Sequence, residues 1–340
     1  MNYPLSLSQQ DVLRLEAIAG AEINTLSFSV LFPYHGDEDL LKKAADHVYT
    51  RFPGLNTVIV RQQNELLSPD ALQVVHPVRF FSSRSEYNCW ARKMASSAVY
   101  AEVQCADITP LIISAKAEGY HIRLHHAIAD GWAASLLLRC LTNAYRDLLS
   151  GHVPDGVEIR PHQDFVKKEA AYLSGPRSLR DAEFWKSFLA GDHDGRLFPA
   201  GMPGDFSAQH ITESLDRQTV VKLKALCAKK GRTFQSVLMS AASIVLEKME
   251  NCTDFCLGTI LLNRKDSAEQ SIFGNCFATV PDHQRGMIRF AGKSRKGKKN
   301  FSPFKHLHQP DQIRQIDRSV PVQVCFPFVQ RYVPAGNKLS

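Results

Sequence analysis

The chain has 340 residues, which is more than one simple core accommodates and about right for two packed lobes or domains. Its composition, 44% hydrophobic and 22% charged, is that of ordinary globular proteins and excludes a disordered regulator, a collagen-like fibre and a disulfide miniprotein. The net charge of +7 comes from the end of the chain, because residues 282–340 hold 12 Lys and Arg against 3 Asp and Glu. The other 281 residues hold 29 Lys and Arg against 31 Asp and Glu and form a near-neutral body.

The hydrophobic pattern predicts helices and strands that alternate along the chain, as in a mixed α/β protein. In chain order it predicts a helix over 8–19, a strand over 23–32, a helix over 37–51, a strand over 55–60, a helix over 83–97, strands over 111–115 and 120–124, and a helix over 131–149. Ser83 and Glu86 have the spacing of a capping box. The turn between the two later strands is expected at residues 117–119.

Turn-rich stretches at 150–156 and 175–178 mark the best boundary between two halves, and we divide the chain into domains 1–174 and 175–340. Beyond this boundary the pattern predicts helices over 179–189, 216–229 and 233–250, and strands over 208–215 and 255–262. Asp216 and Thr233 are suitable N-caps for two of these helices.

The segment YHIRLHHAIADGWA, residues 120–133, carries the pattern that indicates chemistry. A strand delivers His125 and His126, and Asp130-Gly131 follows before a helix. Neighbouring strand residues face opposite sides of a sheet, so only one of the two imidazoles can point into a cleft and act as a base. An imidazole titrates near neutrality, which suits the removal of a proton from an amine or hydroxyl that attacks a carbonyl. Asp130 can pair with an arginine, orient the loop or tune a histidine, and Gly131 allows a tight turn and close backbone approach to a substrate.

This HHxxxDG pattern between a strand and a helix resembles the condensation domains of nonribosomal peptide synthetases, which are related to chloramphenicol acetyltransferase. HHAIADGWA at 125–133 matches the family motif HHxxxDGxS, with Ala133 where Ser is common. Between about residues 4 and 281, further segments are similar to the family: PLSLSQQDVL, QDFVKKEAAYL, AEFWKSFLAG, CLGTILLNR and IFGNCFATVP.

The resemblance implies an α/β (α+β) fold in which two chloramphenicol-acetyltransferase-like lobes form a V-shaped pseudo-dimer with a central tunnel. It also implies a condensation-type acyltransferase, which forms an amide by attack of an acceptor amine on an acyl thioester held on the phosphopantetheine of a carrier protein. His126 would lie beside the thioester and position or deprotonate the amine, and the Gly131 main chain would stabilise the oxyanion. His125 and Asp130 would hold the loop. Carrier proteins and adenylation enzymes are the expected partners, and no bound cofactor is expected.

Two departures from the family pattern affect these expectations. Asn56 stands where the family commonly has an arginine, and that arginine would be the partner of the motif aspartate. Asp130 is therefore expected to rely on one of three side chains: Arg51, Arg123 or Asn56. Ala278 stands where the family usually has Asn, and the match is faint after residue 281, so the C-terminal lobe is expected to be shortened at its end.

Two other functions remain open. A free-standing acyltransferase could use a soluble amine or alcohol as its acceptor. A catalytically silent protein could dock carriers or partner enzymes without transferring a group; the intact motif argues against this reading and the eroded C-terminal match argues for it.

Several properties are expected to be absent. The eight cysteines are scattered singly except for Cys252 and Cys256, and no second pair or histidine lies near these two, so no metal site is expected. The basic stretch 292–300 contains no aromatic residue for stacking on bases, so we expect a solvated segment that binds no nucleic acid specifically. No stretch approaches the roughly 20 apolar residues of a membrane span, and residues 1–17 lack the basic stretch followed by an apolar run, so we expect that they are not a secretion signal. We therefore expect a cytoplasmic monomer.

Overall fold

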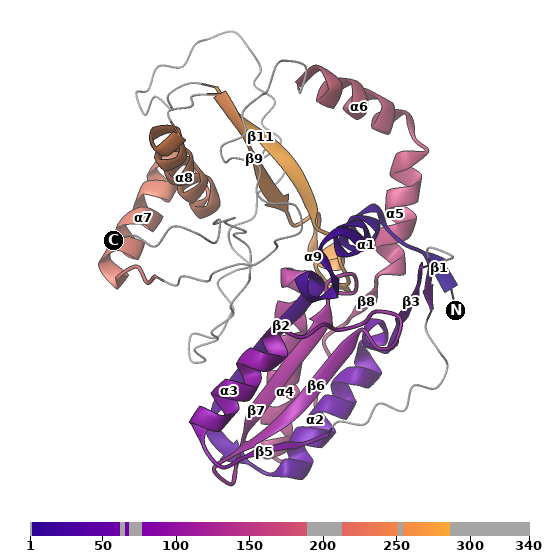
Figure 1. The fold of residues 1–340 in the computed structure, drawn as a ribbon, viewed down its shortest axis with the longest axis vertical. Helices are drawn as coiled ribbons and strands as arrows, with labels where there is room; N and C mark the ends of the chain where they lie inside the picture. Colours follow the sequence, from indigo (N-terminus) through magenta and orange to yellow (C-terminus); the bar gives the residue numbers. More distant parts are fainter. Residues whose placement is uncertain (1, 62–64, 68–76, 189–212, 251–253, 286–340) are drawn as a thin grey trace. The chain divides into compact units, whose positions relative to one another are not determined.

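The computed structural model describes residues 2–61, 65–67, 77–188, 213–250 and 254–285. The chain divides into two compact units (Figure 1). The first unit contains Met1–Leu179 together with the later segment Leu262–Ala278, and the second contains Arg180–Leu261 and continues from Thr279. The V-shaped arrangement of the two lobes stays a prediction.

The segment Leu262–Ala278 packs in the first unit, although the sequence-based boundary at residues 174 and 175 assigns it to the second lobe. Its strand β10 (Ile272–Phe273) pairs in parallel with β8 (Arg160–Pro161). Its Arg264 forms an ion pair with Asp130 of the motif. These long-range contacts attach the segment to a part of the chain more than 100 residues earlier.

A four-stranded sheet forms the centre of the first unit (Figure 1). The strands lie in the order β2 (Thr25–Gly36), β7 (Lys116–His125), β6 (Ala106–Ile113) and β5 (Arg79–Phe81). β7 runs antiparallel to both β2 and β6, whereas β5 is parallel to β6. This order places β7, which leads directly into the motif, in the interior of the sheet.

The turn between β6 and β7 lies at Ser114 and Ala115, so the predicted turn at residues 117–119 is wrong. Both turn residues have positive φ angles, 50° and 61°, which fits a two-residue hairpin turn. Neither is a glycine or asparagine, and the sequence therefore carries no turn signal there. Gly119 lies inside β7 opposite Leu31, with a φ of 153°, and a Cβ at this position would collide with the main-chain oxygen of Val30.

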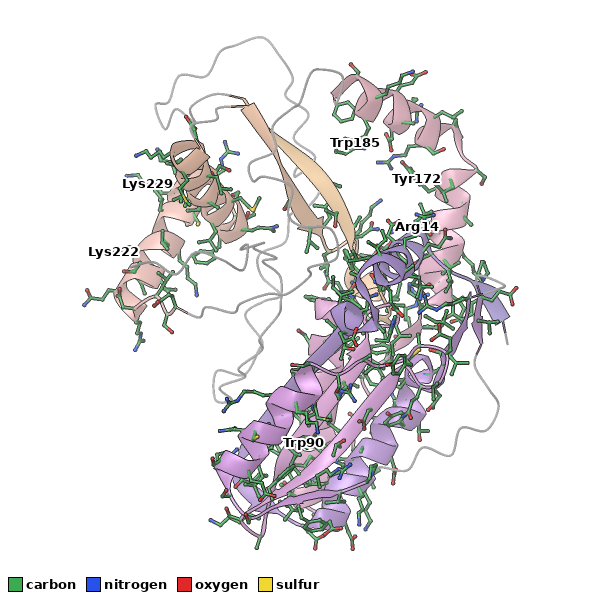
Figure 2. All side chains as sticks on the ribbon, in the orientation of Figure 1. Arg14, Trp90, Tyr172, Trp185, Lys222 and Lys229 are labelled. Carbon is green, nitrogen blue, oxygen red and sulfur yellow. The ribbon has the colours of Figure 1, made fainter. Side chains whose placement is uncertain are left out.

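Helices cover both faces of the sheet. The helices α2 (Glu38–Arg51) and α4 (Gly131–Leu149) pack against each other and against the sheet face whose apolar residues form the main core, including the fully buried Leu41, Ile122 and Leu137. The helix α3 (Arg84–Ala95) covers the other face, where Phe81, Tyr87, Leu111 and Ile113 form a second cluster. Trp90 of α3, labelled in Figure 2, lies edge-on to His121 of β7, with ring centroids 4.8 Å apart.

The remaining elements of the first unit surround this sheet. The helix α1 (Leu7–Ala19) has a capping box in which Ser6 and Gln9 hydrogen-bond each other's main chain. Two 3-10 helices, Ala21–Asn24 and Pro53–Asn56, precede β2 and β3. A small antiparallel sheet joins β1 (Asn2–Pro4), β4 (Glu65–Leu67) and β3 (Val58–Val60). The helices α5 (Gln163–Leu173) and α9 (Ser267–Gln270) complete the unit, and α6 (Pro176–Phe188) spans the boundary between the units.

Besides the part of α6 from Arg180 onward, the described residues of the second unit form the helices α7 (Arg217–Lys230) and α8 (Phe234–Glu250). It also contains the paired strands β9 (Asp254–Leu261) and β11 (Ala278–Arg285). The predicted helices over 216–229 and 233–250 and the strand over 255–262 are confirmed within a residue or two. Asp216 caps α7 by accepting a hydrogen bond from the Thr219 main chain at 2.9 Å.

Most predicted elements of the first unit are also confirmed, among them the helix over 131–149, which matches α4 at both ends. The strand predicted over 55–60 is wrong at its start, because a 3-10 helix occupies Pro53–Asn56 and only Val58–Val60 pairs. The strand predicted over 208–215 and the basic stretch 292–300 fall on residues outside the described ranges, except that 213–215 are described and are not strand. Among the described helices, none is long and apolar enough to cross a membrane.

Candidate functional site

The HHxxxDG motif forms the connection between β7 and α4. His125 is the last residue of β7, and Gly131 is the first residue of α4. The Ile128 main-chain N–H donates to the His125 carbonyl at 3.0 Å and closes a turn between the two elements. No residue from 125 to 130 is more than 6% exposed. The motif is therefore a buried, tightly folded segment.

The His125 ring is held by contacts within the protein. The Ala127 main-chain N–H donates to its Nδ1 at 3.2 Å, so the ring carries its proton on Nε2. That Nε2 lies 2.7 Å from Oε2 of Glu16 in α1 and donates to it. Both ring nitrogens are used in this way, and the side chain is fully buried. This geometry suits a side chain that holds the loop in place.

Glu16 joins His125 to a buried network. It also accepts a hydrogen bond from Asn24 at 3.0 Å and forms an ion pair with Arg61. Burial acts to raise the pKa of the Glu16 carboxyl, but the hydrogen bonds from His125 and Asn24 and the charge of Arg61 outweigh it and lower the pKa to about 2. Glu16 is therefore ionised at neutral pH. Sequence analysis did not single it out, although a glutamate on the same helix face as Val12 and Leu13 is a signal for a buried polar contact.

His126 has different neighbours. Its main-chain N–H donates to the Asn24 carbonyl at 2.7 Å, and its carbonyl accepts from the Asn275 side chain at 2.8 Å. Its ring centroid lies 5.3 Å from that of Phe277. Burial lowers the pKa of His126, and main-chain hydrogen bonding and the charge of Asp130 only partly offset this. The imidazole is therefore neutral at pH 7, which is the form that accepts a proton.

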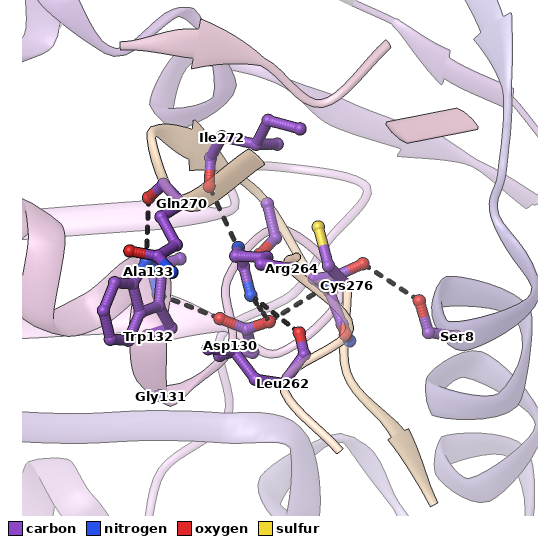
Figure 3. Close-up of polar contacts among 12 residues, drawn as sticks. Ser8, Asp130, Gly131, Trp132, Ala133, Leu262, Arg264, Gln270, Ile272 and Cys276 are labelled. Atoms are coloured by element: carbon purple, nitrogen blue, oxygen red, sulfur yellow. Dashed lines mark hydrogen bonds and ion pairs between the residues drawn. The ribbon is translucent and has the colours of Figure 1, made fainter. Parts of the chain in front are cut away.

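Asp130 caps α4 and forms a buried ion pair (Figure 3). Its Oδ1 accepts from the Ala133 main chain at 2.9 Å, and its Oδ2 lies 2.7 Å from Nη1 of Arg264. The Cys276 main-chain N–H donates to the same Oδ2 at 3.0 Å. The side chains of Arg264 and Asp130 are 0% and 4% exposed. The carboxylate thus joins the start of α4 to the segment Leu262–Ala278.

The expectation that Asp130 relies on Arg51, Arg123 or Asn56 is wrong, because Arg264 is its partner. The three expected side chains are held elsewhere: Arg51 donates to the Val157 carbonyl, Arg123 to the Ser97 carbonyl and Asn56 to the Tyr49 carbonyl. Arg264 lies 134 residues after Asp130, at the end of the stretch CLGTILLNR that resembles the family, but this stretch does not indicate that Asp130 is its partner.

Further contacts hold the segment around Arg264 in place. Nη2 of Arg264 donates to the Gly274 carbonyl at 2.9 Å. Nε1 of Trp132 donates to the Gln270 carbonyl at 2.8 Å (Figure 3). The Asn275 carbonyl accepts from Nε2 of His162 at 3.0 Å. Burial lowers the pKa of His162 to about 4, so this ring donates as a neutral imidazole. Among the described residues, no group of three or more His, Cys, Asp or Glu side chains is arranged to hold a metal ion.

The predicted site residues His125, His126, Asp130 and Gly131 lie together in one segment, and their assigned roles stay predictions. The structure adds Glu16, Arg264 and Asn275, which the sequence analysis missed. Asn275 follows Gly274 within the stretch IFGNCFATVP that resembles the family, and this is the local signal that marks it.

Comparison with known proteins agrees with this picture. The condensation domain family matches residues 1–283 of the chain. One of the subunits of plipastatin synthase from Bacillus subtilis (strain 168) is 21% identical over 319 residues, and the match covers 88% of this chain but 12% of that protein. The chain therefore spans only a small part of the relative's length.

Two solved structures are similar to the chain. VibH, described as an NRPS condensation enzyme, has a TM-score of 0.67 and 20% identity, covering 82% of this chain and 66% of VibH. SgcC5 from Streptomyces globisporus was solved in complex with (R)-(-)-1-(2-naphthyl)-1,2-ethanediol and sucrose. It has a TM-score of 0.66 and 17% identity, and the match covers 84% of this chain and 69% of SgcC5. These similarities confirm the predicted fold class, a mixed α/β fold of the chloramphenicol-acetyltransferase type.

Proposed function

The chain belongs to the condensation domain family, and on that premise we propose that it is an acyltransferase that forms an amide from an acceptor amine and an acyl thioester. The thioester is presented on the phosphopantetheine arm of a carrier protein, so the partners are peptidyl or acyl carrier proteins and the adenylation enzymes that load them. The observation that carries this proposal is the buried His125–Gly131 segment, in which His126 is neutral. The proposal includes a monomeric, cytoplasmic protein that needs no bound cofactor and binds no nucleic acid specifically.

In the proposed reaction, the acceptor nitrogen attacks the thioester carbonyl carbon while the His126 imidazole takes its proton. The tetrahedral intermediate then collapses, the carbon–sulfur bond breaks, and the departing thiolate takes the proton that His126 holds. The products are an amide and a free thiol, and His126 returns to its neutral form. General-base help of this kind contributes roughly 100- to 10,000-fold to the rate.

The N-terminus of α4 is the proposed site of oxyanion stabilisation. The first main-chain N–H groups of a helix have no intrahelical partner, and this helix end carries a partial positive charge. Asp130 takes the N–H of Ala133 and its carbonyl takes that of Ala134. Gly131 lies at the same end, and the absence of a side chain there allows close approach of a substrate oxygen.

A second candidate acceptor is an alcohol, which would give an ester. SgcC5, a structural neighbour of this chain, was solved with a 1,2-diol. The same base and oxyanion site serve either nucleophile, because both attack through a lone pair and lose one proton. The catalytically silent docking protein remains the third alternative.

The test is acyl transfer by the purified chain from a loaded carrier protein to an amine or an alcohol, with the product identified by mass spectrometry. We expect amide formation that His126→Ala reduces and the exposed control His152→Ala does not. Transfer to the alcohol alone would favour the ester-forming alternative. A wild-type chain that binds carriers but transfers nothing would contradict the proposed activity and support the docking protein.

A further inference from the structure

Asn275 is a buried amide next to the proposed base. Its side chain is 0% exposed, and Nδ2 donates to the His126 carbonyl oxygen at 2.8 Å. A carbonyl oxygen only accepts hydrogen bonds, so the nitrogen of the amide must face it, which settles the orientation of the side chain. Among the described residues, Oδ1 of Asn275 has no hydrogen-bond partner. Stability alone does not account for an amide here, because burial of an unpaired carbonyl group is unfavourable.

The residues around Asn275 hold it in place. Its carbonyl accepts from Oγ of Ser8 at 2.9 Å and from Nε2 of His162 at 3.0 Å. The next residue, Cys276, donates its main-chain N–H to Asp130, and the ring of Phe277 lies beside that of His126. Three consecutive residues, 275–277, therefore contact the motif at His126 and Asp130.

The hydrogen bond from Asn275 to the His126 carbonyl also affects the charge of the His126 ring. Main-chain hydrogen bonding at His126 itself and at Ala129 favours the protonated His126 ring. An imidazolium only donates hydrogen bonds, so the main-chain atoms that stabilise it are carbonyl oxygens. The donor that the structure shows at the His126 carbonyl is the Asn275 amide. The positive end of the Asn275 N–H dipole points at the main chain of residue 126 and so disfavours an added positive charge on that residue.

We propose that Asn275 is a positioning residue for the acyltransferase reaction, which fixes the His126 main chain and keeps its imidazole in the neutral form that accepts the proton of the acceptor. This inference rests on the proposed function, and it adds a residue at the end of the polypeptide segment that also carries Arg264. Asn275 acts through His126 and needs no contact with the substrate.

Other charged groups also act on the His126 ring. Asp130 favours the protonated ring and His125 disfavours it. Arg264 pairs with Asp130 and so limits the effect of that carboxylate. His162 reaches the Asn275 carbonyl from the start of α5. None of these groups changes when only the Asn275 side chain is replaced, so a shift in the His126 titration reports on the amide.

The experiment measures the His126 titration by NMR in full-length chain with labelled histidine, with the resonance assigned through His126→Gln. Asn275→Ala removes the donor, so we expect the pKa of His126 to rise by about 0.5 or more. The pKa that the acidic limb of the pH profile of kcat/KM reports for acyl transfer should rise by the same amount. The value of kcat should fall with little change in KM. The control is Asn143→Ala. The Asn143 side chain lies on α4 and accepts a hydrogen bond from Arg146, so this variant should leave the His126 titration and the acyl-transfer kinetics unchanged.

Asn275→Ser is the second variant. Serine leaves a smaller void than alanine does, and its side chain is too short to reach the His126 carbonyl as asparagine does. A folded variant with an unchanged His126 titration and unchanged kcat would overturn the proposal. Failure of both variants to fold would assign Asn275 a purely structural role and overturn it as well. If the wild type transfers no acyl group, the proposed function fails while the NMR titration still decides whether Asn275 tunes His126.

Discussion

Replacement of Arg264 by methionine should strongly destabilise the protein, because it leaves a buried carboxylate without its counter-ion. The pair lies at 2.7 Å, and its side chains are 0% and 4% exposed. Without Arg264, the donors to Asp130 in the described part of the chain are two main-chain N–H groups, those of Ala133 and Cys276. Breaking a buried pair by removal of one partner costs about 3–5 kcal/mol. Because a folded domain is stable by only about 5–15 kcal/mol, this loss is a large share of the total.

The assay is urea unfolding of Arg264→Met, Asp130→Asn and the double variant, followed by tryptophan fluorescence. Asp130→Asn should also lower the free energy of unfolding, because it leaves the guanidinium with carbonyl partners alone. The double variant should lose less than the sum of the two, with a coupling energy of about 1 kcal/mol or more. We also expect acyl transfer to fall, since the segment with Arg264 contacts His126.

The control is Arg14→Met on α1. Arg14 and Asp11 also lie 2.7 Å apart, but their side chains are 67% and 70% exposed. Water screens an exposed pair, so this variant should be near neutral. The reasoning from burial is refuted if Arg264→Met destabilises the protein as little as Arg14→Met does. It is also refuted if the effects of Arg264→Met and Asp130→Asn are additive in the double variant.

Three further predictions concern the motif and the sheet. His126→Ala should reduce acyl transfer by roughly 100- to 10,000-fold while the melting temperature stays near that of the wild type, whereas His125→Ala should lower the melting temperature; near-full turnover in folded His126→Ala would show that positioning alone drives the reaction. Glu16 has its pKa lowered to about 2 in the folded chain, so its ionised form stabilises the fold above the unfolded-state value of about 4.3, and this contribution is lost as the pH falls toward 2. Urea unfolding between pH 6 and pH 2 should show a shallower pH dependence in Glu16→Gln, and an unchanged slope would contradict this. Gly119→Ala should cost about 2 kcal/mol or more in urea unfolding, because its Cβ meets a main-chain oxygen of β2, while Gly151→Ala, with a φ of 74° and open space around it, should cost less.

Local patterns predict the elements of this fold well where one cap and one apolar stripe agree. For α4, Asp130 supplies the cap, and residues such as Leu137 and Leu141 supply the stripe, so both ends are predicted. The hairpin turn is missed because Ser114 and Ala115 adopt positive φ without the glycine or asparagine that usually allows it. In that case the register of the neighbouring strands determines the turn, and a local reading cannot recover it.

The partners of the motif are harder to predict, because they depend on contacts between distant segments. Asp130 and Arg264 are separated by 134 residues, and His125 and Glu16 by 109. Charge alone does not select one arginine among many, and the choice is made by which side chain the fold buries beside the carboxylate. The family pattern led to the expectation of Arg51, Arg123 or Asn56 as the partner, whereas the structure has Arg264, which follows β9.

The segment Leu262–Ala278 is therefore an integral part of the site and not an accessory of the second lobe. It supplies the Arg264 guanidinium and the Cys276 N–H to Asp130, and the Asn275 amide to the His126 carbonyl. A protein that ended at residue 174 would contain every residue of HHxxxDG, but its aspartate would be a buried charge without a counter-ion. The motif alone therefore does not complete the arrangement around Asp130, and the proposed chemistry depends on a segment that follows the 82 residues of Arg180–Leu261.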